Sequence, residues 1–301
     1  MTTKLSKYVQ SKLDEDQITY IMAGERKSHE LSTMVSEGIG IGKHIKVQAK
    51  RQILIEGPPG VGKSHTTRQT CIQNGIQPVE IGTGATASYI AGKLAYAEYW
   101  TPPGQEIVCI YDDADDVVFD KTSINSSKLM FTDESMEPRF IHNVNLTKEL
   151  KSLENSGKVR IVEAMKSFMG EDETGINIPL DRFRFIVLTN EDWERKAERE
   201  RYKYLAPVVD RFNYNRLDYN WTTAWGWLSH VLLNSQPFAN KGFDLTEEQK
   251  VEIINWLYTR WDKMGNKQTY RTVREMAEYI INEPDNYLNR WKKFIRTENA
   301  K

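Results

Sequence analysis

A glycine-rich segment directly after a short apolar run has the residue types that bind phosphate. The apolar run is residues 53–55, and the segment consists of Gly57, Pro58, Pro59, Gly60, Val61, Gly62, Lys63 and Ser64. Glycines let backbone N–H groups curve around a phosphate, a lysine can reach β- and γ-phosphate oxygens, and a serine hydroxyl can bind Mg²⁺. The segment predicts a nucleoside triphosphate site, with a fortuitous glycine turn as the alternative. We include His65, the next residue, among the nucleotide-binding positions and expect no metal or catalytic role for it.

Two carboxylates at the end of another apolar run are candidates for magnesium and water. Asp112 and Asp113 follow residues 107–111, which have the continuous apolar pattern of a strand buried on both faces. A carboxylate at the carboxyl end of a strand beside a phosphate-binding loop can hold Mg²⁺. We assign Asp112 to the metal, together with Ser64, and Asp113 to polarisation of the attacking water. A solvated acidic turn is the alternative, because further aspartates follow.

The elements that would position these residues alternate between strand and helix. Strands are predicted at residues 53–55, 78–81, 107–111 and 183–189, and helices at residues 63–74 and 87–99. This alternation predicts an α/β fold with a doubly wound parallel sheet. The pattern weakens between residues 121 and 180. In this range we expect a helix at residues 147–154 and a hairpin arm at residues 157–162. Before the first strand, residues 38–42 are expected to form a flexible glycine-rich lead-in.

Helices are expected at both ends of the chain. Apolar residues at helical spacing predict an amphipathic helix within residues 4–22. After residue 220, Thr246 and Gln249 have capping-box spacing, a helix is expected from Thr269 to before Pro284, and another at residues 286–295. Six tryptophans are expected to form the core of this region: Trp221, Trp225, Trp227, Trp256, Trp261 and Trp291.

Composition limits the classes of protein to which the chain can belong. The formal net charge is −1, so no overall basic field indicates nucleic acid or an anionic membrane. A basic group before the first predicted strand favours a solvated loop, with phosphate binding as the alternative; it consists of Lys43, Lys46, Lys50 and Arg51. Cys71 and Cys109 lie in elements expected to be buried, which indicates reduced thiols. No segment has the pattern of a signal peptide or the length of a membrane span.

Taken in order, the motifs resemble those of AAA+ ATPases, including small phage-encoded members. Residues 57–64 resemble the Walker A motif, and residues 107–113 resemble Walker B. In that family a glutamate usually follows the Walker B aspartate, whereas Asp113 is one methylene shorter. The resemblance implies ATP and Mg²⁺ as ligands and a P-loop NTPase sheet with a small C-terminal all-helical lid. The shorter side chain of Asp113 predicts a lower hydrolysis rate rather than a loss of ATP binding.

The resemblance also implies roles for polar residues outside these two motifs. Asn190, after residues 183–189, is similar to sensor 1, which holds the attacking water or the γ-phosphate; a helix cap is the alternative. Arg271 is similar to the sensor 2 arginine that contacts nucleotide phosphates from the lid of the same chain. Arg274 shares its helix face, and ordinary surface arginines are the alternative.

A further arginine is expected to act between subunits. Arg211 resembles the arginine finger that reaches the γ-phosphate held by a neighbouring subunit and neutralises charge in the transition state. Arg216 is a weaker candidate, and a surface ion pair between Asp210 and Arg211 is the alternative. A finger of this kind implies that the active unit is a homo-oligomer.

These features predict three regions: an N-terminal helical extension (residues 1–39), a P-loop AAA+ domain (residues 40–218) and a helical lid (residues 219–301). We expect ATP hydrolysis between subunits, used to remodel or load a macromolecular partner, nucleic acid or protein, in a DNA transaction such as replication or recombination. A slowly hydrolysing ATP-gated switch or a protein-remodelling ring is the alternative.

Tyr89 begins a segment similar to an aromatic pore loop, although a Tyr89 side chain packed under the sheet is favoured. The expected location is the cytoplasm, that of a host if phage-encoded, without membrane association.

Overall fold

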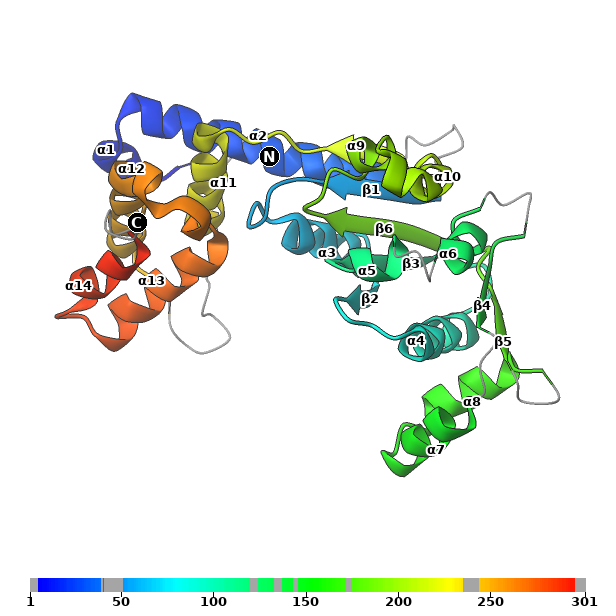
Figure 1. The fold of residues 1–301 in the computed structure, drawn as a ribbon. Helices are drawn as coiled ribbons and strands as arrows, with labels where there is room; N and C mark the ends of the chain where they lie inside the picture. The colour runs from blue at the N-terminus through cyan, green and yellow to red at the C-terminus, as the bar shows by residue number, and fades with distance from the viewer. Residues whose placement is uncertain are drawn as a thin grey trace. The chain divides into compact units, whose positions relative to one another are not determined.

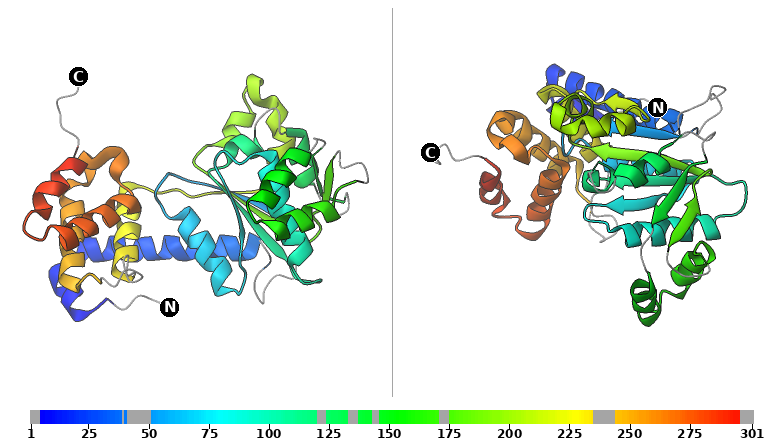
Figure 2. Two further views of the ribbon diagram at one scale, coloured as in Figure 1. Left: turned by 90° about the horizontal axis from the view of Figure 1, so that it is seen from below. Right: turned by 45° about the vertical axis from the view of Figure 1, so that its right-hand side comes forward.

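The chain divides into two units, each with its own hydrophobic core (Figure 1 and Figure 2). The structure, a computed structural model, describes residues 5–38, 40, 51–119, 124–132, 137–142, 146–170, 175–234 and 244–295. Unit 1 comprises Met1–Ser32, Gly57–Lys63 and Leu217–Lys301, and unit 2 comprises Thr33–Glu56 and Ser64–Arg216. The N-terminal residues and the glycine-rich loop therefore group, by their contacts, with the C-terminal helices.

Unit 2 is built on a sheet of five strands whose neighbours all run parallel. Their order is β2 (Val79–Gly82), β3 (Ile107–Asp112), β6 (Phe183–Thr189), β1 (Gln52–Glu56) and β7 (Asn213–Arg216). The register places Glu56 opposite both Thr189 and Arg216, and Asp112 opposite Leu188. Because parallel strands all end at the same edge of a sheet, the last residues of β1, β3 and β6 are brought to one edge of unit 2.

Helices connect the strands of unit 2. Between β1, β2 and β3 lie α3 (Lys63–Gln73) and α4 (Ala87–Trp100). The connection from β3 to β6 contains α5 (Asp115–Val118), α6 (Ile124–Met130), α7 (Thr147–Asn155), α8 (Val159–Ser167) and an antiparallel pair, β4 (Arg139–His142) with β5 (Ile176–Pro179). After β6 come α9 (Trp193–Ala197), a 3₁₀ turn (Glu200–Leu205) and α10 (Ala206–Val209). Helix α8 packs on α4, where Ile161 and Met165 face Gly92.

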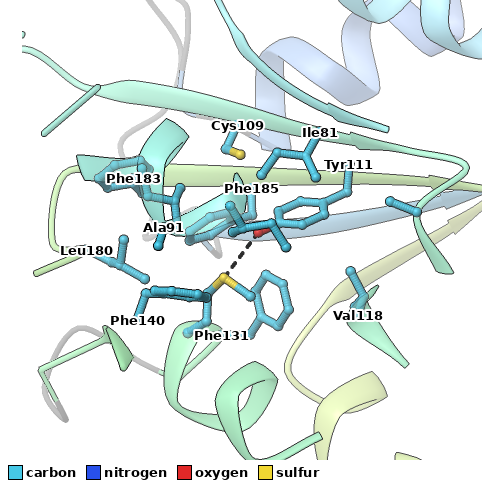
Figure 3. Packing of buried hydrophobic residues seen from close by; sticks show 14 of the residues in the cluster. Ile81, Ala91, Cys109, Tyr111, Val118, Phe131, Phe140, Leu180, Phe183 and Phe185 are labelled. Atoms are coloured by element: carbon cyan, nitrogen blue, oxygen red, sulfur yellow. Dashed lines mark hydrogen bonds between the residues drawn. The ribbon is translucent and has the colours of Figure 1, made fainter. Parts of the chain in front are cut away.

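The middle strands of the sheet are buried on both faces, as a continuous apolar run predicts. Every residue of β1 is buried, and one residue each of β3 and β6 is half-buried. On one face aromatic side chains predominate (Figure 3), where Phe131 meets the Phe185 ring edge-on at 5.2 Å and the Tyr111 hydroxyl donates to Met130 Sδ at 3.2 Å. On the other face, Gly38 at the end of α2 (Glu15–Gly38) lies against the side chain of Ile53.

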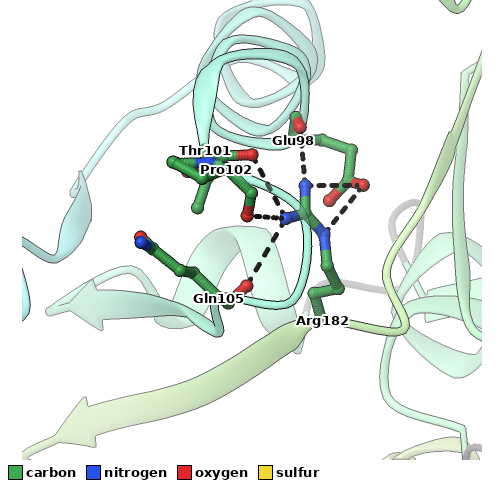
Figure 4. A network of polar contacts seen from close by, with 5 residues as sticks. All are labelled: Glu98, Thr101, Pro102, Gln105 and Arg182. Carbon is green, nitrogen blue, oxygen red and sulfur yellow. Dashed lines mark hydrogen bonds and ion pairs between the residues drawn. The ribbon is translucent and has the colours of Figure 1, made fainter.

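A single arginine fastens the carboxyl end of α4 to the start of β6 (Figure 4). The guanidinium of Arg182 donates to the carbonyls of Glu98 at 2.7 Å, Pro102 at 2.8 Å and Thr101 at 3.2 Å, and it pairs with the Glu98 carboxylate at 3.0 Å. The last carbonyls of a helix have no partner within the helix, and a cation there also favours the helix dipole. Arg182 therefore fixes where α4 ends relative to the sheet.

Unit 1 is a helical bundle with a tryptophan-rich core. It contains α1 (Lys7–Lys12), most of α2, α11 (Trp221–Asn234), α12 (Glu247–Met264), α13 (Tyr270–Asn282), α14 (Tyr287–Trp291) and 3₁₀ turns at Gly265–Lys267 and Lys292–Phe294. Thr246 and Gln249 form the expected capping box, and Thr269 caps α13. Five of the six tryptophans expected in the core are buried, whereas Trp221 is exposed.

Helices α2 and α11 cross at a pair of glycines with their backbones in contact. A Cβ on Gly24 would lie 2.1 Å from the backbone nitrogen of Trp227, and a Cβ on Gly226 would lie 1.9 Å from the carbonyl oxygen of Tyr20. Atoms that are not bonded cannot approach so closely. Glycine is therefore required at both positions, and this crossing joins the N-terminal helices to the C-terminal ones.

Several elements differ from the sequence-based predictions. The expected helix within residues 4–22 is two helices, because the chain is extended at Leu13 and α2 begins at Glu15. Residues 157–162 were expected in a hairpin arm and instead enter helix α8, whose apolar side packs on α4. The lead-in at residues 38–42 lies mostly outside the described residues, and Gly38 belongs to α2. Of the helices in the described ranges, none is long and apolar enough to cross a membrane.

We expect Gly24→Ala to destabilise unit 1, although alanine is the better helix former. The added Cβ would force α2 and α11 apart at a cost of about 1–3 kcal/mol, which exceeds a gain in helix propensity of roughly 1 kcal/mol. Urea unfolding followed by tryptophan fluorescence measures this change, because six of the eight tryptophans belong to unit 1.

Gly92→Ala in α4 is the matched control, since the Cβ there would meet only side-chain atoms, Ile161 Cγ2 at 3.3 Å and Met165 Sδ at 3.5 Å. Its stability should equal or slightly exceed that of the unmodified protein. Equal stability of the Gly24→Ala and unmodified proteins would contradict the close crossing.

Candidate functional site

The glycine-rich loop between β1 and α3 has a backbone that other residue types would not adopt. Gly60 has φ +80° and Gly62 has φ +81°, in the left-handed region that favours glycine. A Cβ on Gly60 would lie 2.8 Å from Thr269 Cγ2, and one on Gly62 would lie 1.9 Å from the Trp227 ring. Both the conformation and the packing therefore require glycine at these two positions.

The lysine of the loop is folded back on the loop itself. Lys63 Nζ donates to the carbonyl oxygen of Gly57 at 2.7 Å and to that of Pro58 at 3.0 Å, and the residue is 7 % exposed. A buried ammonium needs such acceptors because burial otherwise disfavours its charge. The ammonium group is thereby held at the loop. Its N–H donors bond to carbonyl oxygens and could bond to phosphate oxygens instead.

The serine of the loop meets the first of the two predicted carboxylates. Ser64, in the first turn of α3, donates from its hydroxyl to Asp112 Oδ1 at 2.7 Å. A hydroxyl and a carboxylate are both oxygen ligands suited to Mg²⁺, which usually takes one or two protein carboxylates and completes its shell with water and substrate phosphates. Within the described residues no group of three His, Cys, Asp or Glu side chains could hold a metal ion, so a metal here would depend on this pair and on substrate oxygens.

The second carboxylate and the predicted sensor residue are hydrogen-bonded to each other. Asn190 Nδ2 donates to Asp113 Oδ1 at 2.8 Å, and Thr83 at the end of β2 donates from its hydroxyl to the Asp113 carbonyl at 2.7 Å. Asp113 has φ +51°, a conformation that aspartate and asparagine tolerate better than most residues. The alternative for Asn190, a helix cap, is wrong because Asp192 caps α9. Three strand ends thus converge on Asp113.

A network behind Asp113 was not predicted from the sequence. Asp115 Oδ1 accepts from the indole N–H of Trp193 at 2.8 Å, and the same N–H lies 3.1 Å from the hydroxyl of Thr189. Burial raises the pKa of Asp115, and hydrogen bonds from Thr189 and Trp193 lower it. The network joins the segment after β3 to the segment after β6, and so it fixes the spacing between Asp113 and Asn190. In the sequence, the only signals of this network are an aspartate two residues after Asp113 and a tryptophan three residues after Asn190.

The two candidate arginine fingers, Arg211 and Arg216, lie at opposite ends of strand β7. Arg211 precedes β7, and its guanidinium donates to the carbonyl of Pro207; among the described residues it makes no ion pair with Asp210, so that alternative is wrong. Arg216 ends β7 at the same edge as Asp112 and pairs with Glu56 at 3.6 Å and Asp192 at 3.3 Å. Arg211 is therefore remote from the carboxylates of its own chain.

The remaining predicted residues are exposed. Arg271, in the first turn of α13, has no side-chain partner among the described residues, and Arg274 pairs with Glu278 at 3.8 Å. The N-cap of their helix, Thr269, packs on Gly60 of the loop. His65 lies in α3, next to Ser64, and is exposed.

Two predictions about the surface are wrong. The ring of Tyr89 was expected under the sheet but is 49 % exposed. Arg51 was expected in a solvated loop but is buried, and its guanidinium donates to the carbonyls of Leu180 and Phe183. The other three members of that basic group lie outside the described residues.

The structure brings Ser64 to Asp112 and Asn190 to Asp113 at the carboxyl edge of the sheet, and it leaves Arg211 at the opposite edge. An edge with these groups can hold a divalent cation and orient a water molecule. No protein-family model matches the sequence, and a search of curated proteins finds no significant match.

Proposed function

We propose that the chain is a Mg²⁺-dependent ATPase of the AAA+ type that acts as a homo-oligomer on a macromolecular partner. The partner class that we favour is nucleic acid, in a DNA transaction such as replication or recombination. The observation that carries the proposal is the hydrogen bond from Ser64 to Asp112. A loop with two left-handed glycines precedes this serine, and both oxygens suit Mg²⁺.

The residues of the site would divide the work as follows. The N–H groups of the loop and Lys63 hold the triphosphate, and Lys63 exchanges the carbonyls of Gly57 and Pro58 for phosphate oxygens. Ser64 and Asp112 hold Mg²⁺, which when bound neutralises charge on the phosphate oxygens. Asp113 accepts a proton from water that the amide of Asn190 helps to orient.

The position of Asp113 favours slow hydrolysis. Its side chain is shorter than that of glutamate, and Asn190 and Thr83 hold the residue from two sides. A restrained, short carboxylate has a smaller range of positions from which to reach water. An ATP-gated switch or loader is therefore favoured over a fast motor. A protein-remodelling ring is the second candidate, because the ring of Tyr89 is exposed and available to a peptide.

The position of Arg211 supports an assembly of subunits. A four-residue strand spans roughly 13 Å, and Arg211 lies at its amino end whereas Asp112 lies at the carboxyl edge. Arg211 thus acts on nucleotide held by another copy of the chain. Arg216, paired within its own chain, is less suited to that role.

Lys63→Ala should remove ATP binding, because the loop then lacks the cation that balances the triphosphate. We expect affinity for a fluorescent ATP analogue to fall at least about a hundredfold, by an amount typical of lost charge-assisted hydrogen bonds. Lys203→Ala, outside the site, is the control and should leave affinity unchanged. Unchanged affinity in the Lys63→Ala protein would exclude the loop as the nucleotide site.

Asp113→Asn should separate binding from hydrolysis. Asparagine tolerates the left-handed backbone and preserves the side-chain length, so ATP affinity should stay within a factor of about three. Hydrolysis should fall by about a hundredfold or more, the usual effect of removing a general base. Phosphate release at saturating ATP measures this, and a rate equal to that of the unmodified protein would eliminate Asp113 as the base.

Mixtures of two inactive variants test whether Arg211 acts on nucleotide that is bound by a neighbouring subunit. Arg211→Ala should lower hydrolysis by about a thousandfold. In equal, randomly mixed assemblies with Asp113→Asn subunits, about a quarter of the interfaces combine an intact Asp113 with an intact Arg211, and activity should recover to that fraction. Failure to recover in assemblies of native mass would show that Arg211 does not act between subunits.

A further inference from the structure

An exposed line of aromatic and basic side chains runs along α4. The α4 stripe, as we call it, consists of Tyr89, Lys93, Tyr96 and Trp100, which recur at intervals of four, three and four residues and so share one helix face. The three rings are 49 %, 38 % and 43 % exposed. From Tyr89 to Trp100 the helix rises roughly 16 Å, which is the length over which the four side chains are spread.

Two cations lie over the rings of this surface. Lys93 Nζ is 5.6 Å from the centre of the Tyr89 ring, and Arg160 Cζ of α8 is 5.6 Å from the centre of the Trp100 ring. Neither cation makes an ion pair with a described carboxylate. Both are therefore available to an anion that approaches the rings.

The carboxyl end of this surface is held in place before anything binds. Arg182 ties the carboxyl end of α4 to β6 (Figure 4), and the indole N–H of Trp100 donates to the Arg160 carbonyl at 3.4 Å. The Tyr96 and Trp100 rings are 6.5 Å apart, and Tyr99 meets Trp100 edge-on at 5.1 Å. A preorganised platform loses little side-chain entropy on binding.

At its amino end the stripe reaches the candidate active site. Tyr89 lines an open pocket of about 410 Å³ with Gly82, Thr83, Gly84, Ala85 and Thr86. Thr83 is the residue whose hydroxyl donates to the carbonyl of Asp113. A molecule seated on Tyr89 would thus contact the same short segment that restrains Asp113.

We propose that the α4 stripe, together with Arg160, binds single-stranded nucleic acid. Bases stack on Tyr89, Tyr96 and Trp100, and backbone phosphates pair with Lys93 and Arg160, which is the combination used by proteins that bind single strands without sequence preference. Single-stranded nucleic acid would be the partner of the ATPase proposed above, and only its coupling to Asp113 rests on that proposed function. Binding itself requires no nucleotide.

The composition of the surface favours nucleic acid over protein. Exposed aromatic rings beside an arginine occur both at protein interfaces and in sites for single strands, so the charge of the surrounding surface is what distinguishes the two partners. The adjoining α7–α8 segment, residues 147–167, has five basic and three acidic side chains. Aromatic faces with unpaired cations suit bases and phosphates better than an apolar partner.

Binding is measured without nucleotide, by fluorescence anisotropy of labelled oligo(dT) about 12 nucleotides long. The double variant Tyr96→Ala, Trp100→Ala should weaken binding at least about tenfold, since each stacked base contributes about fivefold to a hundredfold. Trp100→Phe should retain most of the affinity because it keeps a ring. Trp221→Ala is the control, since this tryptophan is 47 % exposed and lies in unit 1.

Salt dependence tests the phosphate contacts separately. The plot of log affinity against log salt should have a slope of about −1.4 for two phosphate contacts to a single strand. Lys93→Gln or Arg160→Gln should each reduce the slope by about 0.7. Duplex DNA of the same sequence should bind more weakly, because its bases are already stacked.

Three outcomes would overturn the inference. The first is equal affinity of the double variant and the unmodified protein, and the second is tighter binding of duplex than of single strand. The third is an unmodified protein that does not bind the oligonucleotide, together with a double variant whose oligomeric mass is changed. The last would identify the stripe as a contact between copies of the chain. Lys63→Ala should bind oligo(dT) normally, so loss of ATP binding and loss of nucleic acid binding are distinguishable. Thermal unfolding of each variant establishes that it is folded.

Discussion

The hydrogen bond between Ser64 and Asp112 is the contact around which the candidate site is arranged. It joins the first turn of α3 to the end of β3, two elements that are not consecutive in the chain. The contact exists because β6 lies between β1 and β3 in a parallel sheet, so that all three strands end at one edge. Asn190, at the end of β6, then falls beside Asp113 without any further adjustment. A buried sheet whose middle strands exclude water thus determines where four polar side chains meet.

Much of the sheet could be predicted from the sequence because its middle strands have one simple pattern. Residues buried on both faces are apolar without interruption, and β6 has the bounds that the sequence predicted, Phe183–Thr189. The edge strand β7 was missed because its four residues, Asn213–Arg216, are polar and partly exposed. Residues 157–162 were wrongly predicted as a hairpin arm because their side-chain types are typical of strands. Val159, Ile161 and Val162 favour strands, but they lie in helix α8, which packs on α4 through residues such as Ile161 and Met165.

The residue types of the site were predictable, but the partners that position them were not. Motif spacing identified Ser64, Asp112, Asp113 and Asn190, since each follows a recognisable strand or loop. Thr83 and Trp193 reach the site through tertiary contacts, which leave no local pattern in the sequence. A Tyr89 ring packed under the sheet was favoured because the segment that resembles a pore loop is short and degenerate. The ring is instead exposed, on the same face of α4 as Lys93, Tyr96 and Trp100.

The glycines of the loop connect its conformation to the helices of unit 1. The Trp227 ring of α11 occupies the space where a side chain of residue 62 would lie, and Thr269 at the start of α13 does the same at Gly60. Close-packed contacts of this kind do not deform gradually, because a shift of even half an ångström produces overlap or a gap. Any change in the shape of the loop must therefore displace Trp227 or Thr269. Through Thr269, the displacement would reach the first turn of α13, which bears Arg271. The loop and the two helices are thus coupled by packing, and a change in the loop would pass to the helices without the involvement of any charged residue.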